Sequence, residues 1–419
     1  MTFFTIATYT VLVAYIIASQ RLSVDTIELG GDYRAYSTLT ECVSNGVSIF
    51  SPKPHFIGKY GVIPTLQPYT PAYIYITILI SKLLSVPTVD VIYVILPFFI
   101  SAILPFSIAF LRKTNNLSWK QATILFCVLV FVTDEGLFEL WLYPHGQSIG
   151  IILYLFGLSY LTKKQPLKTC ILFSLSALFH VINLTLIGGT VFYLVLKDRK
   201  ITPNSTFLLF VPLLLSITFV LPAIVMPMTT SDGNQTDLLS FETMSTLTDT
   251  YPNFFAPKTK TITNTKIIVY PILTPLYSGI IQACSLRTIR FFGANVTQTQ
   301  LDRFQQNKMI LSDIPFILVG LLYAFGVPLI SILALLILKK EELYSTISVY
   351  SLPIILTIIY IYTGITIHPE RFVPYIAYYS APFLATVSSK YTRLLYPIIG
   401  LGILRGIIYS TILIMTGGF

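Results

Sequence analysis

Charged side chains are scarce in this sequence of 419 residues. Asp, Glu, Lys and Arg together make up 11% of the chain, whereas hydrophobic residues make up 54%. A soluble protein of this length cannot hide so much apolar surface from water. The composition therefore excludes an ordinary soluble protein and predicts a chain whose solvent is mostly lipid.

Several familiar catalytic and disulfide-forming patterns are also missing. Four cysteines are too few for a disulfide scaffold. The chain has no G-x-x-x-x-G-K-[ST], no G-x-G-x-x-G after a strand, no H-E-x-x-H and no C-x-x-C pair. These absences argue against ATP hydrolysis and dinucleotide chemistry. The net charge of +9 is explained by basic residues in short loops between membrane spans, so it does not indicate a nucleic-acid partner.

What the sequence does contain is a series of long, continuous apolar runs. We therefore expect an all-α integral membrane protein with about eleven transmembrane helices, and not a β-barrel, whose strands alternate in polarity. An N-terminal membrane module, residues 1–226, includes a polar first loop at 21–69 and a proline-bounded juxtamembrane helix at 70–87. A large loop covers 227–310, and further transmembrane helices cover 311–419. The expected spans are 3–20, 89–113, 121–141, 146–162, two short spans within 167–200 that meet near His180–Asn183, 206–226, 311–338, 343–363, 372–388 and 394–415.

Lysine and arginine positions orient this topology. Arg112 and Lys113 end the span at 89–113, and the positive-inside rule places them in the cytoplasm only if 70–87 does not cross the membrane. With that choice, 15 of the 18 acidic residues and all four histidines fall on the external side. Ionisable groups near lipid tend to mark functional surfaces, so we expect any chemistry there. The alternative is that acids simply sort outward while bases sort inward.

Asp32 is the first candidate for catalysis. It lies in GGDYRAYSTLTECVSNG, a stretch that predicts a short polar helix shortly after the first apolar run. A carboxylate at the membrane surface can act as a base for an acceptor hydroxyl or can hold a cation. Partial burial would raise its pKa toward a useful range. Asp32 also suits the N-cap of the predicted helix, and the two roles are compatible.

A second cluster comprises Asp134, Glu135, Glu139 and His145 in TDEGLFELWLYPHGQ. On a continuing helix, Glu135 and Glu139 would share one face. Two acids and a histidine can hold a divalent metal such as Mg²⁺ or Mn²⁺, although the spacing matches no specific metal motif. A solvated turn at the membrane interface is the alternative.

His180 and Arg371 are the remaining candidates. His180 lies in LFHVINLT, at the water-accessible turn where two short spans are expected to meet; a hydrogen-bonded core histidine is the alternative. Arg371 lies in HPERFVPYIAYYSAPF at the start of a late span, where an arginine can bind a phosphate bidentately. The alternative there is a snorkelling arginine paired with Glu370.

As a whole, this layout resembles the GT-C superfamily of polytopic glycosyltransferases, which take sugar from a polyprenyl-phosphate or polyprenyl-diphosphate carrier. The resemblance rests on a first span, the loop with Asp32, the segment LQPYTPAYIYITILISKLLSVPTVDVIYVILPFFISAILPFSIAFLRK, the histidine in SALFHVINL and the arginine in HPERFVPYIAYYSAPFLA. It implies transfer with inversion, on the external face, from a dolichol-type donor to a glycan, protein or lipid acceptor.

The resemblance also implies roles for individual residues. The acidic residue of the family's first external loop corresponds to Asp32, as the base or the acceptor-positioning group. The phosphate-contacting basic groups correspond to Arg371, with His180 nearby.

One departure concerns the acids. Many members carry two adjacent acids in the first loop, whereas here the adjacent pair is Asp134-Glu135, in the second loop. Either Asp32 acts alone, or the two loops converge, or the chain is a distant or inactive relative.

Two other functions fit parts of the sequence. A transporter or flippase of a lipid-linked or small solute would use broken apolar segments such as 70–90 and 167–200 at its binding site. Against it, the two halves show no repeat, and the ionisable groups gather on one face and not near the midplane. A non-catalytic scaffold with the same fold is the third hypothesis.

Overall fold

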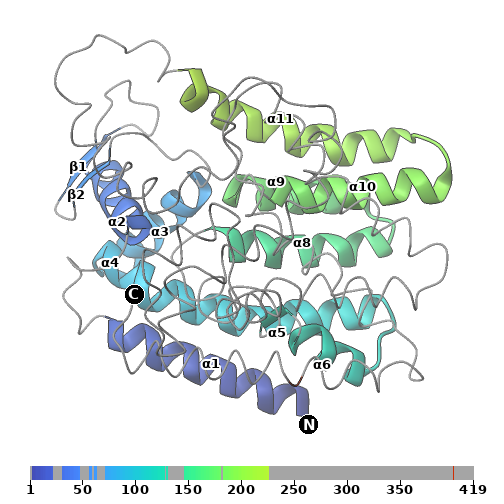
Figure 1. Ribbon diagram of the computed structural model, residues 1–419, viewed down its shortest axis with the longest axis horizontal. Coiled ribbons are helices and arrows are strands. Elements are labelled where there is room, and N and C mark those ends of the chain that lie inside the picture. The colour runs from blue at the N-terminus through green and yellow to red at the C-terminus, as the bar shows by residue number, and fades with distance from the viewer. Residues whose placement is uncertain are drawn as a thin grey trace, which may run out of the picture.

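The computed structural model of this chain is predominantly helical (Figure 1). The structure describes residues 2–21, 31–47, 56–58, 61–63, 71–127, 129–130, 146–180, 183–225 and 400.

Eleven helical elements and two strands make up the described part of the chain. The helical elements are α1 (Thr2–Arg21), α2 (Gly31–Ser44), α3 (Pro71–Leu84), α4 (Thr88–Asp90), the π-helical turn η2 (Val91–Ile95), α5 (Leu96–Thr114), α6 (Trp119–Cys127), α8 (Gln147–Thr162), α9 (Pro166–Phe179), α10 (Leu184–Asp198) and α11 (Pro203–Val225). The strands β1 (Phe56–Gly58) and β2 (Gly61–Ile63) pair in an antiparallel hairpin.

One continuous helical run, formed by α4, η2 and α5, is long and apolar enough to cross a membrane. It covers Thr88–Thr114 and so coincides with the span expected at 89–113. Pro87 is the N-cap residue at its beginning, and Arg112 and Lys113 lie in its last turn, where cations suit the helix dipole. This helix and the composition indicate a membrane location.

Shorter apolar helices of 10–17 residues account for most of the other described elements. They lie at Thr2–Ile16, Pro71–Leu84, Gln147–Thr162, Pro166–Phe179, Leu186–Leu196 and Pro203–Thr218. The count of eleven spans stays a prediction, because the expected spans beyond 311 fall almost entirely outside the described residues.

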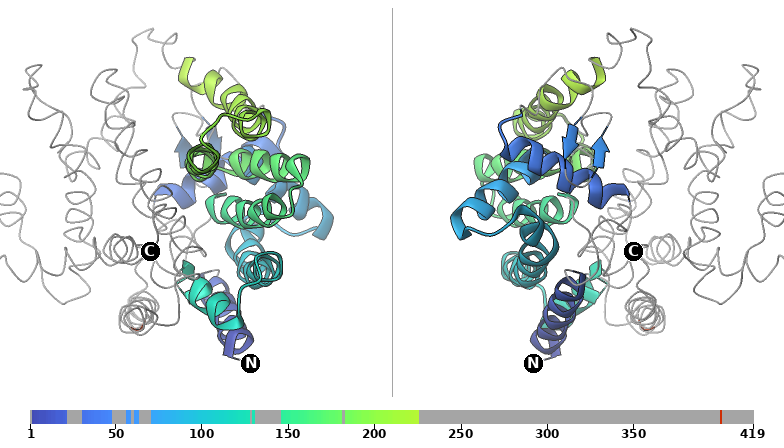
Figure 2. Two further views of the ribbon diagram at one scale, coloured as in Figure 1. Left: turned by 90° about the vertical axis from the view of Figure 1, so that its right-hand side faces the viewer. Right: turned by 90° about the vertical axis from the view of Figure 1, so that its left-hand side faces the viewer.

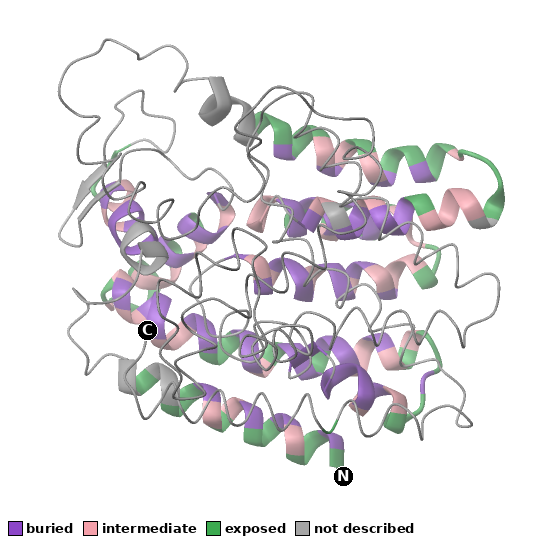
Figure 3. Cartoon of the chain, in the orientation of Figure 1, coloured by how far each residue is buried: buried purple, intermediate pink, exposed green. Residues whose placement is uncertain are grey.

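The long helices pack side by side in a row. α1 lies against α5, α5 against α8, α8 against α9, and α9 against α11, while α10 packs mainly on α11 (Figures 1 and 2). Burial follows this order. α8 is buried along most of its length, whereas α11 exposes much of its surface (Figure 3).

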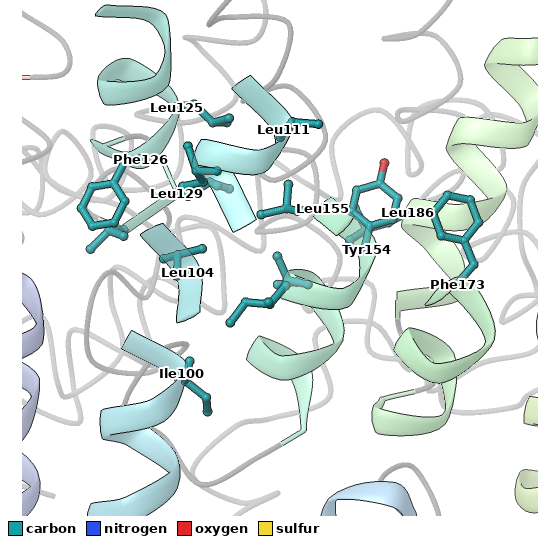
Figure 4. Close-up of a cluster of buried hydrophobic side chains, with 14 of the residues drawn as sticks. Ile100, Leu104, Leu111, Leu125, Phe126, Leu129, Tyr154, Leu155, Phe173 and Leu186 are labelled. Atoms are coloured by element: carbon teal, nitrogen blue, oxygen red, sulfur yellow. The ribbon is translucent and has the colours of Figure 1, made fainter. Parts of the chain in front are cut away.

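Close packing between apolar side chains holds the row together. Tyr154 of α8 stacks on Phe173 of α9 with ring centroids 5.6 Å apart, and its hydroxyl lies 2.7 Å from the hydroxyl of Thr190 in α10. A stacked ring pair and a buried hydroxyl pair thus join α8 to both α9 and α10. The surrounding cluster includes Ile100, Leu104, Leu111, Leu125, Phe126, Leu129, Leu155 and Leu186 (Figure 4).

Short turns gather at one end of the row, which we call the turn end (residues 115–118, 163–165 and 199–202). Thr162 donates a hydrogen bond of 3.0 Å to the side-chain oxygen of Asn115, so the first two turns are tied together. We call the opposite end the break end. It contains Gly146, residues 179–183, α2, α3 and the hairpin (Figure 1).

Two features of the first 200 residues bear on the sequence expectations. The helical break expected near His180–Asn183 is present, since α9 ends at Phe179 and α10 begins at Leu184. The β1–β2 hairpin, within the loop 21–69, was not expected. Its register pairs Phe56 with Ile63 and Ile57 with Val62, so β-branched and aromatic residues face each other across the strands.

Candidate site at the break end

Helix α2 is the element of the first loop that packs most closely on the rest of the chain. It contacts α3 and both strands of the hairpin. The rings of Tyr36 in α2 and Tyr73 in α3 meet edge to face, with centroids 5.6 Å apart. Leu39 and Cys42 of α2 complete the contact on Ile74 and Ile78 of α3. The polar helix is therefore fixed to an apolar one.

The middle of α2 is buried although it is polar. All five residues from Tyr36 to Thr40 are buried, and three of them carry hydroxyl groups on short side chains. Thr40 donates to the carbonyl of Tyr36 at 2.6 Å, whereas the hydroxyls of Ser37 and Thr38 have no hydrogen-bond partner within the described part of the chain. Buried hydroxyls are normally bonded, so these two mark a place that suits water or a hydroxyl-bearing ligand.

Asp32 lies in the first turn of α2. The helix begins at Gly31, so Asp32 is its second residue and not the residue that precedes it. A carboxylate in a first turn interacts favourably with the helix dipole. Asp32 precedes Tyr36 by four residues and so belongs to the same helix face, one turn away from the Tyr36–Tyr73 contact. Its side chain lies outside the described residues.

The start of α8 meets α3 and the end of α9 at two glycines. A Cβ atom added at Gly146 would collide with the backbone carbonyl of Phe179 and would lie 3.2 Å from the Cβ of Tyr73. One added at Gly150 would collide with the side-chain amide of Asn183. Only glycine permits this approach of three helices.

His180 stands at the point where α9 ends. It is half-buried and has an extended backbone, with φ −161° and ψ 120°. Its N–H donates to the carbonyl of Ser176 at 3.2 Å, and its own carbonyl accepts from the N–H of Asn183 at 2.9 Å. The backbone N–H and carbonyl groups of His180 are thus satisfied locally.

Asn183 fixes this break from within the packed helices. It is fully buried, and its side-chain amide donates to the carbonyl of Ser176 at 3.0 Å. The Ser176 hydroxyl in turn donates to the carbonyl of Gly150 at 2.6 Å, which joins α9 to α8. The carbonyl oxygen of the Asn183 side chain has no partner among the described residues. The break end therefore offers a buried acceptor as well as the hydroxyls of α2.

Cys42 is the titratable group of α2 whose environment is best defined. Burial, and secondly the negative charge of the neighbouring Glu41, raise the pKa of its thiol above the usual value. A thiol of this kind stays protonated and is a poor nucleophile near neutral pH. Cys42 thus serves packing against Ile74 and Ile78 and does not suit covalent catalysis.

The structure describes only two of the expected site residues. The backbone of Asp32 and the whole of His180 belong to the same end of the helical row. Arg371, Asp134, Glu135, Glu139 and His145 lie outside the described residues. Among the residues that are described, no group of three or more His, Cys, Asp or Glu side chains could hold a metal ion.

Sequence reasoning singled out His180 but did not single out the glycines next to it. Gly146 and Gly150 form a G-x-x-x-G pattern in GQSIG, which is typical of helices that approach closely in membranes. The sequence therefore contains a signal for a close helix contact at these two glycines. No comparable pattern marks Ser37 and Thr38, because short hydroxyl side chains occur equally in solvated helices.

The chain matches no protein-family model, and no curated protein is significantly similar to it in sequence. Among solved structures it is similar to a crystal structure of the Archaeoglobus fulgidus oligosaccharyltransferase in complex with Zn and sulfate. The TM-score is 0.40 and the identity is 14%, over 96% of this chain and 52% of that protein. The chain thus spans about half the length of that protein, and the likeness is distant.

Proposed function

We propose that this protein is a membrane glycosyltransferase. It transfers a sugar from a polyprenyl-phosphate-linked donor to an acceptor hydroxyl on the external face of the membrane, with inversion. The layout of the sequence supports this proposal, through an apolar first helix, a polar helix with an acidic residue directly after it, and a histidine at a helical break.

The position of α2 is the observation that carries the proposal. This polar helix carries Asp32 in its first turn and, one turn later, a buried segment packed on α3. Through Tyr73 and Gly146, α3 adjoins the α9–α10 break with His180. The proposal is supported by the helix that carries Asp32, by two buried hydroxyls without a partner among the described residues, and by His180, all of which belong to one end of the row.

The proposed reaction exchanges one bond for another at the anomeric carbon. The Asp32 carboxylate accepts the proton of the acceptor hydroxyl as its oxygen bonds to the anomeric carbon. The bond from that carbon to the phosphate oxygen breaks on the opposite face, and the phosphate leaves with the electron pair. Arg371 and His180 stabilise the charge that develops on the phosphate. The lipid tail stays in the bilayer between spans.

A divalent cation, Mg²⁺ or Mn²⁺, belongs to the proposal as an optional partner of the phosphate. Asp134, Glu135 and His145 are the residues proposed to hold it, since carboxylates and imidazole are suitable ligands. The step described above does not depend on it.

The test is transfer of a labelled sugar by the purified full chain in lipid, supplied with a pool of polyprenyl-phosphate sugars. Asp32→Asn removes the base while keeping the size of the side chain, so the rate should fall by about 10² to 10⁴. Glu41→Gln is the matched control, because it changes another acid of the same helix and should keep the wild-type rate.

Three outcomes would overturn the proposal. They are no transfer by the folded wild type from any donor, transfer that survives Asp32→Asn, and equal loss in both variants. Movement of the intact labelled lipid across the bilayer without transfer would instead identify a flippase.

A further inference from the structure

The turn end carries a group of cations. Two of its turns and the helix ends beside them contain Arg112, Lys113, Lys163, Lys164 and Lys168. The chain has no Asp or Glu from residue 91 to 133 or from 140 to 197, so no acid close in sequence offsets these charges.

Arg112 is held rigidly at the end of α5. Its guanidinium carbon lies 4.1 Å from the centroid of the Trp119 ring, and its Nη1 donates to the carbonyl of Leu117 at 3.2 Å. Its Nε is buried and has no hydrogen-bond partner within the described ranges. The Arg112 side chain is therefore fixed in place, and no acid close in sequence offsets its charge.

Two lysines lie over aromatic rings next to this site: Lys163 in the turn after α8, and Lys168 in the first turn of α9. The Nζ of Lys163 lies 4.5 Å from the centroid of Phe110 and 5.6 Å from that of Tyr160. The Nζ of Lys168 lies 5.4 Å from the same Tyr160 ring. Cation–π contacts limit the motion of these long side chains and hold their charges at the depth of the rings.

The two turns cannot separate freely. Thr162, directly before Lys163, donates to the side chain of Asn115, three residues after Arg112, at 3.0 Å. The helices that carry them, α5 and α8, also pack along their length, and Phe110 and Phe156 meet with centroids 5.7 Å apart. The cations of both turns therefore form one preorganised surface and not two independent flexible loops.

Apolar side chains exposed to the surroundings lie beside these cations. Phe106 of α5 is 67% exposed and Leu167 of α9 is 64% exposed, while Trp119 is 43% exposed. A ligand that bears an anion next to long apolar chains would satisfy both features. An inorganic anion or a soluble nucleotide would satisfy only the first.

We propose that this surface, defined by Arg112, Trp119, Lys163 and Lys168, binds the phosphate of an anionic phospholipid. The acyl chains lie along the exposed apolar side chains of α5 and α9. The site is distinct from the break end, and it rests on the membrane location of the chain but not on sugar transfer, so either proposal can fail without the other.

The test uses the purified full chain in a nonionic detergent and follows the fluorescence of Trp119. Trp141→Phe leaves Trp119 as the single tryptophan, because the chain has two. Phosphatidylglycerol should give a saturable change, whereas phosphatidylcholine and inorganic phosphate should give none. Lipid retention measured by native mass spectrometry on the unaltered chain provides a second readout that does not depend on the Trp141 substitution.

The variant Arg112→Gln, Lys163→Gln and Lys168→Gln should weaken phosphatidylglycerol binding by about a hundredfold, because each cation near a membrane surface contributes about fivefold. The matched control, Lys82→Gln, Arg199→Gln and Lys200→Gln, removes the same charge from exposed positions outside the four-residue surface, two of them in the third turn of the turn end, and should bind as the wild type does. Equal loss in both variants, equal binding of phosphatidylcholine, or a saturable response to inorganic phosphate would overturn the proposal.

Discussion

The side-chain amide of Asn183 donates a hydrogen bond to the backbone carbonyl of Ser176, 3.0 Å away, across the break between α9 and α10. Ser176 lies in the last turn of α9, and its carbonyl also accepts the N–H of His180 at 3.2 Å, so Asn183 adds a second donor to this carbonyl. Asn183 therefore acts as a cap contributed from the next helix, and it sets how the chain turns at His180.

Replacing Asn183 tests this role. Asn183→Ala removes this hydrogen bond and leaves a small cavity at a buried position, so it should cost about 1–3 kcal/mol of stability. Asn183→Asp should cost more, because it places a carboxylate against the Ser176 carbonyl in a buried position. The measurement is the thermal midpoint in detergent of each purified variant. An Asp variant as stable as the wild type would contradict the assignment of the amide.

The close approach of α8 to α9 and to Asn183 can be tested at Gly150, which lies at this approach. Gly188 is the control, because it has open space beside it. Gly150→Ala places a methyl group into the Asn183 amide and 2.8 Å from the Ser176 carbonyl, so it should destabilise by about 1–3 kcal/mol. Gly188→Ala meets nothing within 4 Å and should be neutral or stabilising, because alanine favours a helix. Thermal unfolding followed by fluorescence-detected size exclusion distinguishes the two. Equal thermal midpoints for the two variants would contradict the close contact of Gly150 with Asn183 and Ser176.

The hydrogen bond between the hydroxyls of Tyr154 and Thr190 should make a small but measurable contribution to the free energy of unfolding. An intramolecular hydrogen bond contributes about 1 kcal/mol to stability on average. Tyr154→Phe and Thr190→Val each remove one partner and keep the shape, and the double variant completes a mutant cycle. We expect a coupling energy near that average from denaturant unfolding in mixed micelles. A coupling of zero would mean that the 2.7 Å contact does not contribute.

Cys42 should react slowly with alkylating agents. Because its pKa is raised, the reactive thiolate is a smaller fraction at any given pH than for an exposed cysteine. The alkylation rate, measured by mass spectrometry of the Cys42 peptide after iodoacetamide treatment, should rise only at a higher pH than for free cysteine. Glu41→Gln removes the like charge, lowers the pKa and should speed the reaction. A profile that matches free cysteine would contradict the burial of this thiol.

Hydrophobic patterning predicted the elements that depend on local sequence. The apolar run before Arg112 and Lys113 is the long helix Thr88–Thr114, and the polar residues around His180 mark the break between two short helices. The hairpin was not predicted. Its strands, FIG and GVI, are separated by only Lys59 and Tyr60, which is the spacing of a hairpin, but strands of three residues leave too short a pattern to recognise within a polar loop.

The candidate site was harder to predict because it depends on contacts between distant segments. The polar sequence of α2 suggests a solvated helix, yet Tyr36–Thr40 is buried. Nothing in the composition of α2 shows that α3 will cover it. The role of Asn183 likewise arises only when α8 brings Gly150 against it. The roles of Asp32, Arg371 and the acids near 134 stay predictions.

The short turns have a consequence for how the chain is assembled during synthesis. Three residues separate α8 from α9, and the two helices are packing neighbours. Such sequence-local pairs close quickly, since little loop entropy is lost. The pair can therefore form as soon as the second of its two helices has been synthesised. The order in which helices leave the ribosome would then already be the order in which the row is built.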